Sequence, residues 1–268
     1  MILVRVFLFL AFLGALSLCL PISSPSAWKK LAPGFLTGEF LSTQGSSEAE
    51  LTVVRISPDH YRLKLLSSSE IGTDPLPLAE WAEKYDLLAA VNAGMYQENH
   101  TTSTGYMKNF GHFNNPSINP LYGAFLAFNP KQENLPPVLI VDRQHSPDWR
   151  EIISSYDSVV QNYRMISSKG KNLWPPSEKR FPVACIAIDE KGEILIIYSS
   201  SLLSVHELNE ALLDLPFSIV SAMYVEGGTI AGLVFDKGTL SGEPEYRIMG
   251  NGRLTNLPNV LGIVPADE

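Results

Sequence analysis

The residues best suited to chemistry lie where an apolar, strand-like run ends in a carboxylate. That carboxylate is Glu226, and Gly227 and Gly228 follow it directly. Glycine opens positive φ angles and lets backbone N–H groups approach a ligand closely. A carboxylate on a rigid strand end, beside such a backbone, can present an acid to a sugar or a phosphate. One alternative stays open, because Gly-Gly is also an ordinary hairpin turn, here between residues 223–225 and 232–235.

Polar residues stand at the end of an apolar run, or inside one, at three further places. They are Asn92 with Gly94, Gln161 with Arg164, and Arg180. Buried polar groups that find no partner cost several kcal/mol, so these side chains need a common site or local partners. A ligand-binding site in which they meet Glu226 would satisfy them. Structural ion pairs, in which Arg164 or Arg180 bridges Glu226 or Asp189, would do so as well.

Composition and spacing exclude several classes of function. The chain has 268 residues, of which 45% are apolar and 18% charged, as is typical of a globular protein. Its formal net charge of −8 argues against a nucleic-acid-binding surface, which needs clustered Lys and Arg. The sequence has no His-x-x-x-His, Cys-x-x-Cys, Walker or Gly-x-Ser-x-Gly pattern. We therefore predict no cofactor and no metal site, although the Asn-rich residues 97–119 leave a divalent cation such as calcium open.

The N-terminus resembles a secretory signal. Arg5 precedes an uninterrupted apolar run, residues 6–16, and small and polar residues follow. An uncleaved anchor over residues 1–22 stays open, since its length approaches the ~20 residues that a span needs. We expect an exported protein, periplasmic or extracellular, with or without N-terminal membrane anchoring. The expected segments are 1–27 as signal peptide or membrane anchor, 28–48 as a Pro-, Ser- and Gly-rich linker, and 49–268 as the folded domain.

Short elements must position these residues. Apolar and β-branched runs predict hairpins over 51–66 and 184–198, and strands over 87–91, 122–128, 137–141, 159–166 and 260–264. Helical spacing predicts helices over 76–85, 148–156 and 204–215, the last opened by a capping box at Ser204. Many short strands with two or three helices predict an α+β fold: a single domain with one mixed sheet and the helices packed on it. Cys185 lies inside an apolar run, which indicates a buried thiol rather than a nucleophile.

Four stretches, taken in order, carry a resemblance to a known family. They are residues 88–96 (LAAVNAGMY), 161–166 (QNYRMI), 180–189 (RFPVACIAID) and 224–228 (YVEGG). The first is similar to the opening motif of the phosphodiester glycosidase domain family. The others are similar to its Gln-Ser-Gly-Pro-Met-Leu segment, its Arg-Thr-Ala-Val-Gly-Ile-Asp strand and its Leu-Asp-Gly-Gly-Gly-Ser segment. Animal relatives of this family include the enzyme that uncovers mannose 6-phosphate by removing a blocking N-acetylglucosamine.

The resemblance implies a phosphodiester-glycosidase-like domain and an exported hydrolase acting on a sugar joined through its anomeric carbon to phosphate. It implies that Glu226 is the catalytic carboxylate, as nucleophile, base or electrostatic stabiliser, and that Arg180 is the catalytic residue that grips the phosphate. The implied substrate-binding residues are Asn92, Gly94, Gln161, Arg164, Gly227 and Gly228. The expected partner is a carbohydrate or sugar-phosphate ligand of the cell envelope, and no oligomeric state follows from the sequence.

This chain departs from the family pattern in two of the four stretches. Glu226 stands where the family usually has Asp, and Asn162, Tyr163 and Arg164 stand where it has Ser-Gly-Pro. Two other functions therefore stay open. One is a non-catalytic module that binds an envelope glycan in the same cleft. The other is a structural envelope protein, in which Glu226 and Arg180 would form a closed ion pair.

Overall fold

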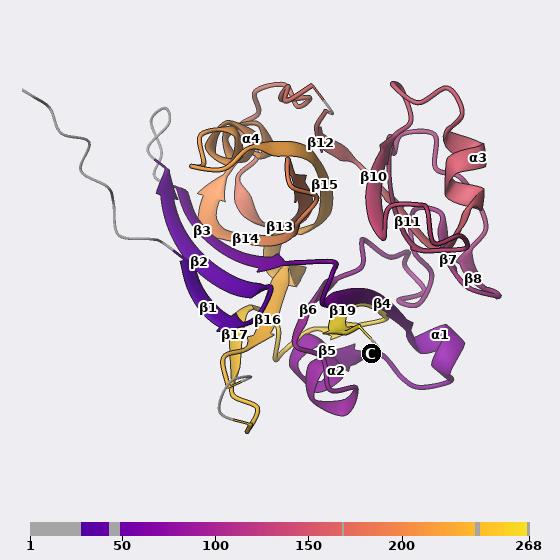
Figure 1. Ribbon diagram of the computed structural model, residues 1–268, viewed down its shortest axis with the longest axis horizontal. Coiled ribbons are helices and arrows are strands. Elements are labelled where there is room, and N and C mark those ends of the chain that lie inside the picture. The colour runs from indigo at the N-terminus through magenta and orange to yellow at the C-terminus, as the bar shows by residue number, and fades with distance from the viewer. Residues whose placement is uncertain (1–27, 43–48, 168, 239–241, 267–268) are drawn as a thin grey trace, which may run out of the picture.

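Three antiparallel sheets enclose a shared core in the computed structural model, which describes residues 28–42, 49–167, 169–238 and 242–266 (Figure 1). The seven-stranded sheet has the order β1 (Trp28–Ala32), β2 (Phe35–Ser42), β3 (Ala49–Ile56), β14 (Ile194–Leu203), β13 (Phe181–Asp189), β15 (Ile219–Gly227) and β12 (Arg164–Ile166). The second sheet has the order β10 (Val138–Asp142), β9 (Ala124–Pro130), β11 (Tyr156–Asn162), β7 (Met107–Asn109) and β8 (His112–Asn115). The third has the order β17 (Tyr246–Gly250), β16 (Gly232–Asp236), β6 (Ala89–Asn92), β19 (Asn259–Pro265) and β4 (Tyr61–Ser67).

Each sheet turns one face to the common core and the other to a helix. Successive side chains of a strand point to opposite faces, so one strand can serve both. The common core takes Ile186 from the seven-stranded sheet, Leu126 from the second and Val91 from the third. The outer faces are covered by α4 (Val205–Leu213), α3 (Trp149–Ser154) and α2 (Leu78–Lys84), in that order of sheets. Burial on both faces explains why strands such as β13 are continuous apolar runs.

The remaining elements are short. They are α1 (Ser68–Ile71), a two-stranded ladder of β5 (Leu76–Pro77) with β18 (Asn256–Leu257), and a 3₁₀ turn, η1 (Gly228–Ile230). Local signals explain the longest helix, because the Ser204 hydroxyl accepts a bond from the Glu207 N–H while the Glu207 side chain accepts one from the Ser204 N–H. This confirms the capping box that the sequence predicts.

The single mixed sheet with two or three helices is wrong. The described residues form several sheets with antiparallel pairings throughout and four α-helices. The predicted hairpin over 51–66 is also wrong, because β3 pairs with β2 and β14 while β4 pairs with β19. The turn between β3 and β4 thus carries the chain from one sheet to another. By contrast, the β13–β14 hairpin is confirmed, and so are strand β19 and helices α2 and α3 within a few residues.

Two predicted segments change their boundaries. Residues 28–42, predicted as linker, form β1 and β2. The burial of the Phe35 and Phe40 side chains stabilises these strands at the edge of the sheet. The predicted strand 159–166 divides at Tyr163 into β11 and β12, which belong to different sheets. The predicted signal peptide or anchor lies outside the described residues. Within the described ranges, no helix combines the length and apolar character needed to cross a membrane.

Candidate active site

Glu226 lies buried near the end of β15, with 5% of its surface exposed. Among the described residues it forms no ion pair, and its carboxylate accepts one hydrogen bond of 2.9 Å from the N–H of Gly227. Burial disfavours the charged form and raises the pKa of Glu226 to about 7, although the bond from Gly227 opposes that rise. The group therefore changes charge near neutral pH, which favours general acid–base catalysis at that pH.

Three phenols lie within electrostatic reach of this carboxyl group. They belong to Tyr96, Tyr122 and Tyr224, which come from three separate parts of the chain. Burial is the main cause that raises the pKa of each phenol, and the negative charge of Glu226 adds to it. The phenols therefore remain protonated at neutral pH, and those of Tyr96 and Tyr224 can donate hydrogen bonds to a ligand. The Tyr122 hydroxyl is itself 3.0 Å from the Thr104 hydroxyl, to which it donates.

The turn after Glu226 is held by Asn92. The Asn92 side-chain amide donates to the carbonyl of Ile230 at 3.1 Å, and its oxygen accepts from the Gly232 N–H at 3.0 Å. Because β15 and β16 lie in different sheets, the pair Gly227-Gly228 is not a hairpin turn, and that alternative is wrong. It carries the chain between sheets through η1, with Gly228 at a φ of +71°.

Gly227 must be glycine for a different reason. A Cβ at this position would run into the Tyr224 hydroxyl and would lie 2.6 Å from the Phe181 ring. The backbone of Gly227 is extended, so close approach rather than an unusual φ excludes a side chain. Tyr224 and Phe181 therefore pack directly over the backbone that follows Glu226.

Gly94 and Asn162 meet beside the same strand. The Asn162 side-chain amide donates to the carbonyl of Val225 at 3.1 Å, and its oxygen accepts from the Tyr163 N–H at 2.8 Å. A Cβ on Gly94, whose φ is +136°, would lie 3.3 Å from the Asn162 amide nitrogen. Asn162 thus anchors the residue before Glu226, and Gly94 leaves room for it.

The side-chain amide of Gln161 makes all of its hydrogen bonds to other groups of the protein. Its amide donates to the carbonyls of Asn119 and Tyr122, both at 2.8 Å, and its oxygen accepts from the N–H groups of Tyr106 at 3.0 Å and Asn119 at 2.9 Å. A primary amide has two donors and two acceptor positions, and all four are filled here. Gln161 therefore ties the polar segment to β11 rather than facing a sugar.

The two arginines predicted for the site are paired with carboxylates other than Glu226. One nitrogen of Arg164 contacts both oxygens of Asp142, at 2.8 and 3.0 Å. Arg180 forms an ion pair of 2.6 Å with Glu207 at the start of α4. The closed Arg180–Glu226 pair expected of a purely structural protein is therefore wrong, and Asp189 pairs with Arg55 instead, at 2.6 Å.

Asp142 gathers further polar contacts at the end of β10. The ring of His145 lies 2.8 Å from its carboxylate, and the Gln144 N–H donates to it at 3.0 Å. Burial alone would raise the pKa of Asp142, but these bonds and Arg164 outweigh it and hold the pKa below its ordinary value. Asp142 therefore stays ionised and fixes Arg164 in place.

The Asn-rich residues 97–119 fold back on themselves. Each asparagine oxygen of the segment accepts a hydrogen bond from the protein, at Asn99, Asn109, Asn114, Asn115 and Asn119. The described ranges contain no group of three His, Cys, Asp or Glu side chains placed to hold a metal ion. The amide oxygens that could serve a cation therefore stabilise the segment itself.

Sequence reasoning brought together only part of this site. Asn92 bonds the turn that follows Glu226, Gly94 leaves room for Asn162, which bonds the residue before Glu226, and Gly227 and Gly228 follow Glu226 directly, whereas Gln161, Arg164 and Arg180 are engaged elsewhere. The phenols were missed. Tyr224 lies only two residues before Glu226, but a register shift in β15 between the two residues breaks the simple alternation of faces, so strand spacing alone does not predict that they meet. No local signal marks Tyr122.

Comparisons with known proteins place the fold. The chain resembles the structure of a hypothetical protein from Synechocystis (TM-score 0.67, 14% identity), covering 91% of this chain but only 64% of that one. It resembles the catalytic domain of zebrafish N-acetylglucosamine-1-phosphodiester alpha-N-acetylglucosaminidase, auto-inhibited by its pro-peptide (TM-score 0.59, 12% identity, covering 87% and 84%). It also resembles a putative exported protein from Burkholderia pseudomallei (TM-score 0.54, 11% identity, covering 83% and 75%).

The sequence itself supplies the family. No curated protein sequence matches the chain. The phosphodiester glycosidase family, however, matches it over residues 85–264, which span β6, the polar segment, Glu226 and β19. This confirms the resemblance carried by the four motifs: the chain belongs to the phosphodiester glycosidase family.

Proposed function

We propose that this protein is a hydrolase that cleaves the bond between the anomeric carbon of a sugar and a phosphodiester. The observation that carries the proposal is Glu226, a buried carboxyl group whose pKa is raised to about 7 by burial and which faces no cation in the described residues. Phenol donors and a glycine backbone surround it. The family supports a hydrolase of this general class.

The proposed step is the attack of water on the anomeric carbon. A new bond joins the water oxygen to that carbon, and the bond from carbon to the phosphate oxygen breaks, so that the phosphate ester leaves with the electron pair. Phosphate leaves readily, so protonating it matters less than stabilising an oxocarbenium-like transition state. The Glu226 carboxylate accepts the proton of the attacking water, and its charge faces the developing positive charge.

The surrounding groups hold the substrate. We assign the phenols of Tyr96 and Tyr224 and the N–H of Gly228 to sugar hydroxyls or phosphate oxygens, and the Tyr122 oxygen, whose proton is donated to Thr104, to a sugar hydroxyl. Gly227 uses its own N–H on Glu226. We assign Arg180 to the scissile phosphate because it precedes Phe181, whose ring packs over Gly227, and because its side chain is 37% exposed while paired with Glu207, so that a phosphate would have to share the guanidinium with Glu207 or displace it.

The test uses the full chain, its Glu226→Gln variant and Glu80→Gln, an exposed glutamate of α2, as the matched control. Each is incubated with methyl phosphodiesters of the 1-phosphates of glucose, mannose and N-acetylglucosamine, and free sugar is measured. We expect the parent and Glu80→Gln to release sugar and Glu226→Gln to be slower by at least ~100-fold. Because the ionised form is active, kcat/KM of the parent should rise with pH through about 7. Equal rates in the parent and Glu226→Gln would contradict the proposal.

A glycan-binding module without catalysis is the second candidate. It is favoured by the engagement of Gln161 and Arg180 with protein partners, which leaves fewer groups poised for the reaction. This candidate expects no sugar release by the parent and a raised melting temperature with the same compounds. Glu226→Gln would then bind as the parent does.

We also propose that the protein acts outside the cytoplasm. The support is the charged-then-apolar order of its first residues, and one structural relative is described as a putative exported protein. Cell fractionation of a chain with a C-terminal tag tests this. Recovery of the tag only in the cytoplasmic fraction would contradict it.

A further inference from the structure

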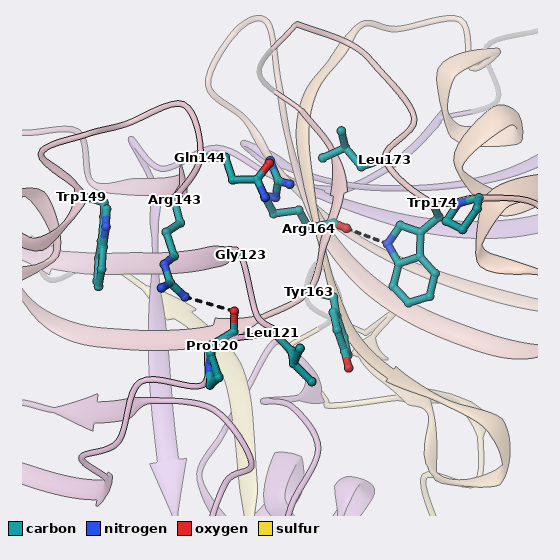
Figure 2. Close-up of a pocket in the computed structure, with 11 residues that line it drawn as sticks. Pro120, Leu121, Gly123, Arg143, Gln144, Trp149, Tyr163, Arg164, Leu173 and Trp174 are labelled. Atoms are coloured by element: carbon teal, nitrogen blue, oxygen red, sulfur yellow. Dashed lines mark hydrogen bonds between the residues drawn. The ribbon is translucent and has the colours of Figure 1, made fainter.

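A cavity of about 520 Å³ opens between the end of β10 and the segment that follows β12 (Figure 2). It is lined by Pro120, Leu121, Gly123, Arg143, Gln144, Trp149, Tyr163, Arg164, Leu173, Trp174 and Pro175. Its volume lies in the range of pockets that hold small ligands, roughly 300–1,000 Å³. Glu226 does not line it.

The cavity carries an unbalanced positive charge. Arg164 is neutralised by Asp142, to which it is bound at 2.8 Å. Arg143 forms no ion pair among the described residues: its guanidinium contacts the carbonyl oxygens of Asn119 and Pro120, each at 3.4 Å, and lies over the Trp149 ring, 5.4 Å from its centre. Since those contacts are long, a phosphate or carboxylate could replace them with shorter, charge-assisted bonds.

Rigid aromatic rings stand on opposite sides of this charge. Figure 2 shows Trp149 and Arg143 on one side of the cavity and Trp174 on the other. The Trp174 ring is fixed by a bond of 2.6 Å from its N–H to the carbonyl of Arg164. The Trp149 ring is stacked on Phe125 and lies against Arg143 and Arg150, so Trp174 and Tyr163 are the rings that can present apolar surface to the C–H face of a sugar.

Tyr163 separates the cavity from the candidate active site. The centre of its ring lies 4.4 Å from that of Tyr122 and 6.4 Å from that of Tyr224, whose phenols are within electrostatic reach of Glu226. Its carbonyl accepts from the Tyr224 N–H at 3.0 Å. Tyr163 thus lines the cavity on one side and packs against two of the phenols near Glu226 on the other.

We propose that this cavity is a subsite for an anionic sugar residue, bearing a phosphate or a carboxylate, in the part of the substrate beyond the scissile phosphate. The proposal rests on the proposed function in taking that substrate to be the one cleaved at Glu226. Arg143 binds the anionic group, and Tyr163 and Trp174 contact the sugar ring. Arg164, fixed by Asp142, forms one wall of the cavity. Residue 123 is glycine because a Cβ there would lie 2.6 Å from the Arg164 side chain.

The first experiment measures binding to the full chain by calorimetry. The probes are glucose 6-phosphate, glucuronate and neutral glucose, so that phosphate and carboxylate are separate arms. The variants are Arg143→Gln, Arg143→Lys and, as the control of equal charge, Arg150→Gln. Arg150 also stacks on Trp149, at 4.2 Å from the ring centre, but it does not line the cavity.

We expect at least one anionic probe to bind the parent and Arg150→Gln alike, with glucose much weaker. Arg143→Gln should weaken that probe by about ten- to a hundredfold, and Arg143→Lys by less. The proposal is overturned if Arg143→Gln and Arg150→Gln behave alike, or if glucose binds as well as both anions. Near-UV circular dichroism checks that each variant is folded.

The second experiment separates this proposal from the proposed function. Two phosphodiesters of glucose 1-phosphate are compared for kcat/KM. In one the sugar beyond the scissile phosphate is glucose, and in the other it is glucose that carries an additional 6-phosphate. Arg143→Gln should lower the value for the anionic compound only. Turnover with no such discrimination would overturn the subsite and leave the proposed function standing. Arg143-dependent binding in the parent and Glu226→Gln, without any turnover, would support the anionic-sugar site and overturn the hydrolase.

Discussion

At the scale of single residues, Glu226 is a carboxyl group held where its uncharged form is favoured. It is shielded from water, and one backbone N–H is the only hydrogen bond to its carboxylate from the described residues. Glu207 is the opposite case, because burial is outweighed by bonds from Ser204 and Arg180, which hold its pKa below the ordinary value. The pKa of Glu226 is thus raised above the ordinary value of glutamate, and the pKa of Glu207 is lowered below it.

This contrast makes a prediction for stability. The pKa of Glu226 is about 7 in the folded chain against 4.5 when unperturbed. Because the folded value is raised, its contribution to the free energy of unfolding is complete below about pH 4.5 and is lost as pH rises through about 7. The loss amounts to about 3 kcal/mol. Urea unfolding between these pH values should show this decline in the parent and not in Glu226→Gln.

The Glu207→Gln variant is the control of opposite sign. Its lowered pKa means that the parent gains stability from Glu207 above the unperturbed pKa and loses it as pH falls. Glu207→Gln should therefore keep the decline between about pH 4.5 and 7 that Glu226 causes. A decline that survives in Glu226→Gln would contradict the account of Glu226.

Gln161 gives a second prediction at this scale. Replacing it by leucine removes four hydrogen bonds at once and leaves buried backbone groups of the polar segment without partners. The free energy of unfolding should fall by about 3 to 6 kcal/mol. Gln132→Leu, at an exposed position, should change it by less than about 0.5 kcal/mol. Similar stabilities for the two variants would show that Gln161 is not the anchor described.

At the scale of elements, the connection from β15 through η1 to β16 is the feature that places Glu226. Gly227→Ala would push the Tyr224 hydroxyl and the Phe181 ring away from the strand end. We expect sugar release to fall by at least ~100-fold, because a displacement of about 1 Å is enough for such a loss. Gly111→Ala, where a Cβ meets nothing within 4 Å, should retain the parent rate. A fully active Gly227→Ala would contradict the role given to this turn.

Local elements were predictable and their partners were not. The β13–β14 hairpin and the capping box of α4 follow from residues a few positions apart, so the sequence showed them directly. Glu226 was recognisable for the same reason, as a carboxylate between an apolar strand and two glycines. The assignment of β3 and β4 to different sheets depends on β14 and β19, far along the chain, and has no local signal. The pairing of Arg180 with Glu207 likewise depends on where α4 packs.

At the scale of the whole molecule, the three sheets share one core, so they should unfold together. Leu126 is fully buried in it, and Leu126→Ala should lower the free energy of unfolding by about 2 to 5 kcal/mol. The four tryptophans together report on all three sheets, since Trp81 lies in α2, Trp149 in α3, and Trp28 and Trp174 pack on the seven-stranded sheet. Fluorescence and far-UV circular dichroism should give coincident transitions in parent and variant.

The control for this prediction is Leu121→Ala, because 74% of Leu121 is exposed. Its stability should stay within about 0.5 kcal/mol of the parent. Separate transitions for the two spectroscopic signals would show that the layers are independent, contrary to a common core.

The pairing of β4 with β19 has a consequence for how the chain is made. Residues 61–67 can pair only after residues 259–265 have been synthesised. Because β19 also joins β4 to β6, the third sheet is in two parts until then. In the same way, β3 waits for β14. Pairings between such distant segments form slowly, because a long loop must close before any contact is gained. In a nascent chain with this order of strands, the second sheet can pair within residues 107–162, whereas the third sheet cannot be completed until the C-terminal residues have been synthesised.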